Sequence, residues 1–362
     1  MIYGIIRIFQ RLCNVNHPLK LLAGATVALI GALLAVWLKT PLPWMLGPLF
    51  FVALFRISSA PIVSSPYLRY VGQWGIGTSL GLYFTPLVVD VIAKNMGPII
   101  CGMLFAFFLG IYGTFIYRRF GKVDMRTAWF SSAIGGASEM TSLSEKYGGR
   151  QDLVASAHSL RILTVVVVIP FAFQALGVVG LDSSSPGPKV VVLNGLLLLA
   201  TITGCSALLA SYFKVPNGWV LGPMFVSMGL TMSGIELSAL PDYVSKTGQL
   251  LIGWSLGDKF RAGFFRIAPR FLFSVIFCSI SSLLLACGCA FLLAVWSNIP
   301  LPTLILGLAP GGIAEMAITA KVLQLGIPLV TAFQVSRMAF IVLITGPFYQ
   351  YVITRFSKNP ID

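Results

Sequence analysis

Long apolar runs separated by short polar segments dominate the pattern of this chain. The run Leu21–Leu38 has no charged residue over 18 positions, which is the length of a helix that crosses a lipid bilayer. Comparable runs follow at Ile99–Tyr117, Ile162–Gly180, Val190–Tyr212, Phe271–Trp296 and Met338–Ile353. The pattern predicts an all-α polytopic membrane protein.

One order of motifs occurs twice along the chain. The segment GQWGIGTSLG at 72–81 returns as GQLLIGWSLG at 248–257, an offset of 176 positions. The Gly-Gly pairs at 135–136 and 311–312 share this offset, and WMLGPLF at 44–50 returns as WVLGPMF at 219–225. We therefore predict a cytoplasmic lead-in at 1–20, a first membrane repeat at 21–180 and a second at 189–353.

Each repeat contains about six apolar elements. In the first repeat we expect them near 21–38, 42–57, 67–91, 97–117, 127–147 and 153–179. In the second repeat we expect them near 190–212, 217–233, 246–257, 270–296, 302–322 and 328–353.

The basic loops do not coincide in the two repeats. The segment Tyr117–Arg126 is strongly basic, whereas its counterpart Ala294–Thr303 has no charge. Conversely, Asp258–Arg270 is basic, whereas its counterpart around Asp90–Lys94 has one lysine. Because basic loops are retained in the cytoplasm, equivalent loops should face opposite sides of the membrane. This predicts two inverted-topology repeats, the usual plan of secondary transporters.

Inversion requires an odd number of crossings in each repeat, so one of its elements should not span the membrane. We expect ten full crossings plus two interrupted or re-entrant elements, which contain the Gly-Gly pairs. The short element LPWMLGPLFF at 42–51 is the alternative.

Composition and charge are consistent with this interpretation. Only 10% of the residues are charged, against about 25% in a soluble domain. The formal net charge of +14 would favour nucleic-acid binding in a soluble protein, but no soluble region is long enough for a DNA-binding domain. We expect membrane lipid and a small-molecule or ion ligand as partners, and no nucleic acid. Homo-oligomerisation stays open.

The sequence contains no recognisable enzyme motif. His17 and His158 lack metal-ligand spacing, and no nucleotide loop, nucleophile elbow or catalytic triad pattern occurs. Six cysteines without ligand spacing are interpreted as mostly buried thiols: Cys13, Cys101, Cys205, Cys278, Cys287 and Cys289. We therefore expect no enzyme activity, no metal and no cofactor.

A glutamate follows each Gly-Gly pair in an otherwise apolar context. Residues 133–140 read AIGGASEM, and residues 307–316 read GLAPGGIAEM. Glycine weakens a helix by about 1 kcal/mol per residue, and a broken helix at membrane depth frees backbone groups that can bind ions. We predict an ion or substrate site at Gly135, Gly136, Ser138, Glu139, Gly311, Gly312 and Glu315. The alternatives are glycine-mediated helix packing and glutamates that serve only as partners for arginines.

Each repeat also has an arginine deep in its last element. Arg161 lies eight residues after Leu153, which is about 12 Å into a hydrocarbon core of roughly 30 Å. Arg337 is its counterpart. An arginine at this depth requires a partner, so we expect each guanidinium within roughly 4–6 Å of a glutamate or an anionic ligand. Snorkelling of the side chain is the alternative.

Four further polar residues, one histidine and three glutamines, extend this predicted site. His158 lies three residues before Arg161 on the same helix face, and Gln334 occupies the equivalent position before Arg337. His158 is interpreted either as a satisfied buried histidine or as a proton relay. Two amides in matched elements, Gln73 and Gln249, either line a cavity or bond between helices.

These residues resemble the AbrB family of bacterial inner-membrane proteins. The duplicated W-x-LGP segment, the GQ…SLG segment, the GGxxEM phrase and the following arginine carry the resemblance, which extends from about 24 to 353. The family has two legacy labels, ammonia monooxygenase and regulator of gene expression. It is also distantly similar to the cation/proton antiporter and bile-acid symporter superfamily. That similarity implies transport by a multi-pass protein of the inner membrane.

We therefore expect a proton- or sodium-coupled secondary transporter for a small solute, an anionic solute being one option, with its site between the two repeats. The glutamates would bind the coupling cation, and the arginines would balance them or hold the solute. The alternative is a membrane-embedded regulator or sensor that affects gene expression indirectly, and an ammonia monooxygenase is the third option.

Overall fold

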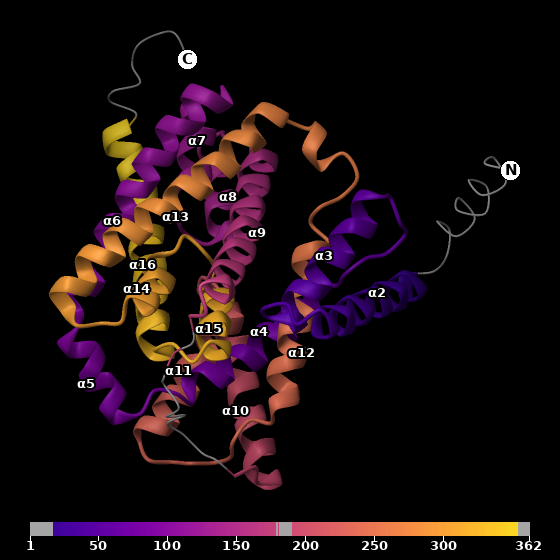
Figure 1. The fold of residues 1–362 in the computed structure, drawn as a ribbon, viewed down its shortest axis with the longest axis vertical. Helices are drawn as coiled ribbons and strands as arrows, with labels where there is room; N and C mark the ends of the chain where they lie inside the picture. Colours follow the sequence, from indigo (N-terminus) through magenta and orange to yellow (C-terminus); the bar gives the residue numbers. More distant parts are fainter. Residues whose placement is uncertain (1–16, 179, 181–189, 354–362) are drawn as a thin grey trace, which may run out of the picture. The chain divides into compact units, whose positions relative to one another are not determined.

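The computed structural model describes residues 17–178, 180 and 190–353, and every regular element in this part of the chain is a helix (Figure 1). In the first half the elements are α2 (His17–Trp37), α3 (Pro43–Ile57), α4 (Pro66–Gly81), α5 (Pro86–Lys94), α6 (Met96–Ile116), η1 (Tyr117–Gly121), α7 (Met125–Ser132), α8 (Ala137–Lys146) and α9 (Gln151–Ala175). In the second half they are α10 (Leu193–Tyr212), α11 (Gly218–Met232), α12 (Asp242–Gly257), η2 (Phe264–Arg266), α13 (Pro269–Ser297), α14 (Leu301–Leu308), α15 (Ile313–Val322), α16 (Ile327–Phe348) and η3 (Tyr349–Ile353).

The helix lengths and composition confirm an all-α polytopic membrane protein. Within the described residues, six helical segments are long and apolar enough to cross a bilayer, and they contain α2, α6, α9, α10, α13 and α16. Helices α3 and α11 are apolar but shorter. Length alone does not decide whether the shorter helices cross, so the count of ten crossings stays a prediction.

The predicted element near 67–91 is two helices. Helix α4 ends at Gly81, and α5 begins at Pro86 after Thr85 in extended conformation. Proline has no backbone N–H to donate and its fixed φ suits the first position of a helix, so Pro86 starts a new helix rather than continuing α4.

Contacts divide the chain into two compact units, and each unit contains parts of both predicted repeats. Unit 1 comprises Met1–Ile76 and Leu240–Ile267, and unit 2 comprises Gly77–Ala239 and Ala268–Asp362. The predicted junction between the repeats, at 181–188, lies outside the described residues. The repeat boundaries therefore stay a prediction.

Unit 1 is built on close packing of α12 against α3. An added Cβ at Gly253 would collide with the backbone of Met45, so the two helices approach backbone to backbone. Nearby, Arg56 forms an ion pair with Asp258 at 2.8 Å, and Ser64 donates a hydrogen bond to the same carboxylate at 3.1 Å. These contacts fix the end of α12 beside α3.

Unit 2 contains the predicted Gly-Gly elements. Helices α7, α8 and α9 pack against one another, as do α14, α15 and α16, and α9 and α16 also contact α15 and α8 respectively. One buried apolar cluster includes Trp129, Phe130 and Met140, and another includes Leu304 and Phe333. The hydrophobic core of this unit therefore surrounds both Gly-Gly segments.

Candidate functional site

Both Gly-Gly segments break their helices, as the sequence predicts. Helix α7 ends at Ser132 and α8 begins at Ala137, while α14 ends at Leu308 and α15 begins at Ile313. The first residue of each break is an extended alanine: Ala133 has φ −54° and ψ 127°, and Ala309 has φ −57° and ψ 137°. Pro310 enforces the second break, because the residue before a proline avoids the helical region.

The arginines bind the carbonyl ends of the first half-helices. Arg161 donates from Nη1 to the backbone oxygens of Ser131, Ser132 and Ala133 at 3.5, 3.3 and 3.3 Å. Arg337 donates from Nη1 to Ala309 O at 2.5 Å and from Nη2 to Gly311 O at 2.7 Å. A helix C-terminus has unsatisfied carbonyls and partial negative charge, so a buried guanidinium is stabilised there.

This arrangement differs from a direct arginine–glutamate ion pair. Arg161 and Arg337 are 6% and 4% exposed, which excludes snorkelling. Within the described part of the chain, neither forms an ion pair with a glutamate. Their hydrogen-bond partners are instead backbone carbonyls and, for Arg161, a histidine. Backbone carbonyls therefore supply partial negative charge to both guanidinium groups, and the predicted approach of a glutamate or an anionic ligand to within roughly 4–6 Å stays a prediction.

His158 is a fully buried histidine with partners on both ring nitrogens. Its Nε2 lies 2.9 Å from Phe130 O, and its Nδ1 lies 2.9 Å from Arg161 Nη2. A carbonyl can only accept and a guanidinium can only donate, so the proton resides on Nε2 and Nδ1 accepts. These contacts favour the satisfied buried histidine over the proton relay.

Gln334 repeats the role of His158 in the second half. Its Nε2 donates to Leu306 O at 2.7 Å, to Ala309 O at 3.2 Å and to Gly307 O at 3.3 Å. The His158–Phe130 and Gln334–Leu306 bonds both join residues 28 apart, as do the Arg161–Ala133 and Arg337–Ala309 bonds. The same contacts therefore recur at the 176-residue offset of the sequence motifs.

The glutamates occupy the opposite side of each break. Gly136 and Gly312 are the N-cap residues of α8 and α15, so Glu139 and Glu315 lie in the first turn of these helices. Each carboxylate folds back over its glycine so closely that an added Cβ would collide with Oε2. The partial positive charge of a helix N-terminus stabilises a carboxylate there. Only glycine leaves room for this placement.

The two glutamates differ in burial. Glu315 is 5% exposed, and its carboxylate forms no ion pair in the described part of the chain. Glu139 is half-buried, and Ser138 beside it is exposed. Gln73 and Gln249 are 8% and 6% exposed and belong to unit 1, so their predicted role in lining a cavity stays a prediction.

Several further polar atoms of the site are buried without a hydrogen-bond partner among the described residues. They are Arg161 Nε, Arg337 Nε, Gln334 Oε1 and Ser131 Oγ. Buried polar atoms are usually satisfied, so this cluster of donors and acceptors can hold water or a ligand.

The groups that hold the first break in place were not predicted from the sequence. Ser132 Oγ bonds to Gly110 O at 2.7 Å and to Thr114 Oγ1 at 2.8 Å, and Trp129 Nε1 donates to Thr345 O at 3.1 Å. Backbone partners cannot be read from side-chain types. One sequence signal for the arginine–carbonyl contacts was available: Arg161 and Arg337 each follow an alanine, Ala133 and Ala309, by 28 residues.

Comparison with known proteins identifies the family. The model of the family described as "Transition state regulatory protein AbrB" matches residues 44–353, which include both breaks and both arginines. The chain belongs to the AbrB family. This confirms the resemblance read from the duplicated motifs.

Two relatives are bacterial proteins of similar length. "Uncharacterized protein YhjN" of Bacillus subtilis (strain 168) is 26% identical over 333 residues, covering 85% of this chain and 86% of that protein. "Putative regulator AbrB" of Escherichia coli (strain K12) is 24% identical over 325 residues, covering 88% of this chain and 92% of that protein. The AbrB-family similarity thus extends over both halves of the chain.

Proposed function

We propose that this AbrB-family protein is a secondary active transporter, coupled to protons or sodium, for a small solute. Glu315 carries the proposal, because its side chain is 5% exposed and its carboxylate forms no ion pair among the described residues. Burying a carboxylate without an ion-pair partner is costly even at a helix N-terminus, so a bound cation would offset this cost. A site that gains and loses a cation is what ion coupling requires.

The broken helices support the same function. Secondary transporters bind substrates and coupling ions at discontinuous helices near the membrane midplane. Here the Arg161 and Arg337 guanidinium groups hold one side of the two breaks, and glutamates lie at the other. Two buried arginines, each with an Nε that lacks a hydrogen-bond partner among the described residues, favour an anionic solute.

We place the protein in the bacterial inner membrane, with basic loops in the cytoplasm, a small-molecule or ion ligand as its partner and no nucleic-acid contact of its own. No catalytic step is proposed. The described residues hold no group of three or more histidine, cysteine or acidic side chains that could bind a metal. A homo-oligomer is compatible with the proposal and is not needed for it.

A membrane-embedded regulator is the alternative function. One relative is named a regulator, and the family description names a regulatory protein. In that case the same buried site would bind a ligand without moving it across the membrane, and a partner protein would relay the signal.

Currents from proteoliposomes on a solid-supported membrane test the proposal. A panel of small organic anions is applied with an imposed proton or sodium gradient. The wild-type protein should give a gradient-dependent current with at least one anion, and Glu315→Gln and Glu139→Gln should abolish it. Glu145→Gln, an exposed glutamate on the same helix as Glu139, is the matched control and should keep the current.

Thermal unfolding separates transport from sensing. If sodium or an anion raises the melting temperature of the wild-type protein but not of Glu315→Gln, the site binds the ligand. Binding without any current across the whole panel would favour the regulator and contradict transport.

A further inference from the structure

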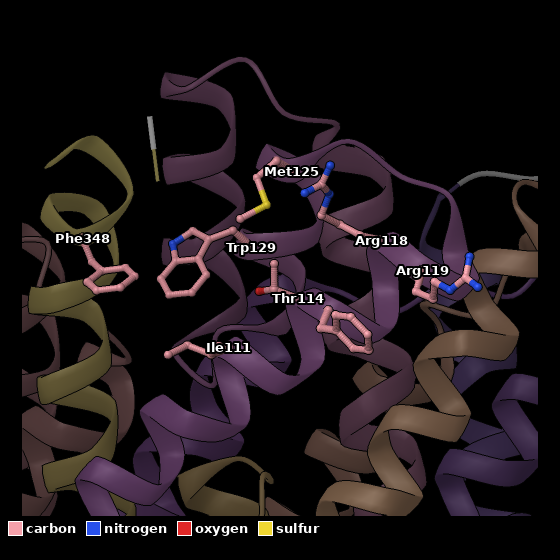
Figure 2. A pocket seen from close by; sticks show the side chains of 8 residues that line it. Ile111, Thr114, Arg118, Arg119, Met125, Trp129 and Phe348 are labelled. Carbon is pink, nitrogen blue, oxygen red and sulfur yellow. The ribbon is translucent and has the colours of Figure 1, made fainter. Parts of the chain in front are cut away.

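A pocket of about 490 Å³ opens beside helix α6 at the point where α6 continues into the π-turn η1 (Figure 2). Its apolar wall consists of Ile111, Phe115, Met125, Trp129 and Phe348. The rings of Trp129 and Phe348 stack with centroids 5.3 Å apart, and Figure 2 shows them side by side. The wall combines α6, α7 and α16, all of unit 2.

The polar atoms of this wall already have partners. Thr114 Oγ1 bonds to Gly110 O at 2.8 Å and to Ser132 at 2.8 Å. The indole N–H of Trp129 donates to Thr345 O at 3.1 Å. The interior therefore presents hydrocarbon and aromatic surface to an occupant, which suits an alkyl chain better than a polar metabolite.

Positive charge gathers at one end of the pocket. Arg118 and Arg119 line it, both are exposed, and both lie on η1. Arg270 of α13 donates from Nε to Phe120 O of the same turn at 2.8 Å, which brings a third guanidinium to η1. Because η1 is the first part of the basic segment Tyr117–Arg126, the positive-inside rule predicts that this end lies at the cytoplasmic surface.

The second half of the chain lacks these two arginines. At the 176-residue offset, Arg118 and Arg119 correspond to Ala294 and Val295 in the second half. The duplicated framework therefore does not require arginines at these positions. Besides the orienting effect of basic loops, these arginines are available to a ligand of the pocket that they line.

We propose that this pocket binds an anionic phospholipid, with an acyl chain against Trp129 and Phe348 and the phosphate at Arg118 and Arg119. Charge complementarity and lateral exposure carry the assignment. Phe115 is 65% exposed and Ile111 is 44% exposed, so the pocket opens along the apolar face of α6, where lipid chains have access. Basic pockets between transmembrane helices at the cytoplasmic side bind anionic head groups in this way.

Quenching of Trp129 fluorescence by brominated phospholipids tests this site. Full-length protein in phosphatidylcholine nanodiscs is titrated with brominated phosphatidylglycerol or brominated phosphatidylcholine, and the signal of Trp129→Phe is subtracted to isolate Trp129. Half-quenching should occur at a roughly tenfold lower mole fraction of phosphatidylglycerol than of phosphatidylcholine. Equal mole fractions for the two lipids would overturn the proposal.

Paired variants test the arginines. The double variant Arg118→Ala, Arg119→Ala should lose the phosphatidylglycerol preference, whereas Arg261→Ala, Arg266→Ala, which removes two exposed arginines of unit 1, should keep it. In the wild-type protein 0.5 M NaCl should reduce the preference, because salt screens exposed charges. A preference that survives both the double variant and salt, or one that free inorganic phosphate abolishes, would overturn the lipid assignment.

Discussion

At the scale of single residues, charge at each break is balanced by the ends of helices rather than by opposite side chains. Arg161 and Arg337 bind carbonyls at the ends of α7 and α14, and Glu139 and Glu315 lie at the starts of α8 and α15. A helix end bears roughly half an elementary charge. Four buried or half-buried charged side chains can therefore be stabilised without forming one ion pair.

Replacing Arg337 by alanine should destabilise the protein. The change removes the donors to Ala309 O and Gly311 O at a buried position, and each unsatisfied buried carbonyl costs about 1–3 kcal/mol. Arg161→Ala should act in the same direction. Reversible unfolding in mixed micelles measures the change, with the exposed Arg261→Ala as control. Unchanged stability of both buried-arginine variants would contradict the carbonyl assignment.

Gly312→Ala should impair ligand binding more than folding. The new methyl group would occupy the space of Glu315 Oε2 and displace a flexible carboxylate rather than backbone. We expect the melting-temperature increase with sodium or an anion to be lost while the ligand-free melting temperature changes little. Gly288→Ala in α13, where an added Cβ meets nothing within 4 Å, is the control. An unaltered ligand response in Gly312→Ala would show that carboxylate position does not matter.

At the scale of elements, the repeated glycines of α4 and α12 are explained by helix packing. Gly253 of α12 lies against Met45 of α3, and Gly77 of α4 lies against Val220 of α11. These pairs are equivalent at offsets of 175 and 176, with the halves exchanged. Each GQ…SLG helix thus packs on the W-x-LGP helix of the other half, once in unit 1 and once in unit 2.

Gly253→Ala should therefore force α12 away from α3. Backbone cannot shift as a flexible side chain can, so we expect a loss of about 1–3 kcal/mol in the free energy of unfolding. Gly229→Ala in α11, which meets nothing within 4 Å, should leave stability unchanged or raise it by up to about 1 kcal/mol through helix propensity. Equal stabilities of the two variants would argue against the close contact.

Apolar periodicity and internal duplication predicted the helices and the two breaks, because these features depend on local composition. The partners of Arg161 and Arg337 were not predictable in the same way. Every residue has a backbone carbonyl, so residue type does not indicate which carbonyls a guanidinium contacts. The three-dimensional fold determines those contacts. The apolar pattern also predicted one element where the structure has α4 and α5. The pattern is apolar on both sides of the break, so it did not reveal that α4 ends at Gly81 and that α5 begins at Pro86.

At the scale of the whole molecule, the opposite distribution of basic loops makes a topological prediction. Single cysteines at Arg119 and Arg261 should react only from the cytoplasm, and a cysteine at Asn298 only from the periplasm. Labelling of intact cells with an impermeant maleimide, after replacement of the native cysteines, measures this. Labelling from outside at 119 or 261, with none at 298, would contradict the inverted repeat.

The hydrogen bonds of each break also have a consequence for biosynthesis. Arg161 and His158 reach carbonyls that lie 28 to 30 residues earlier in the chain, and the corresponding bonds of the second half are equally local. The hydrogen-bond partners of each buried guanidinium are therefore synthesised before the arginine itself. Once α9 has left the ribosome, Arg161 can form its hydrogen bonds to these carbonyls while the second half of the chain is still being translated.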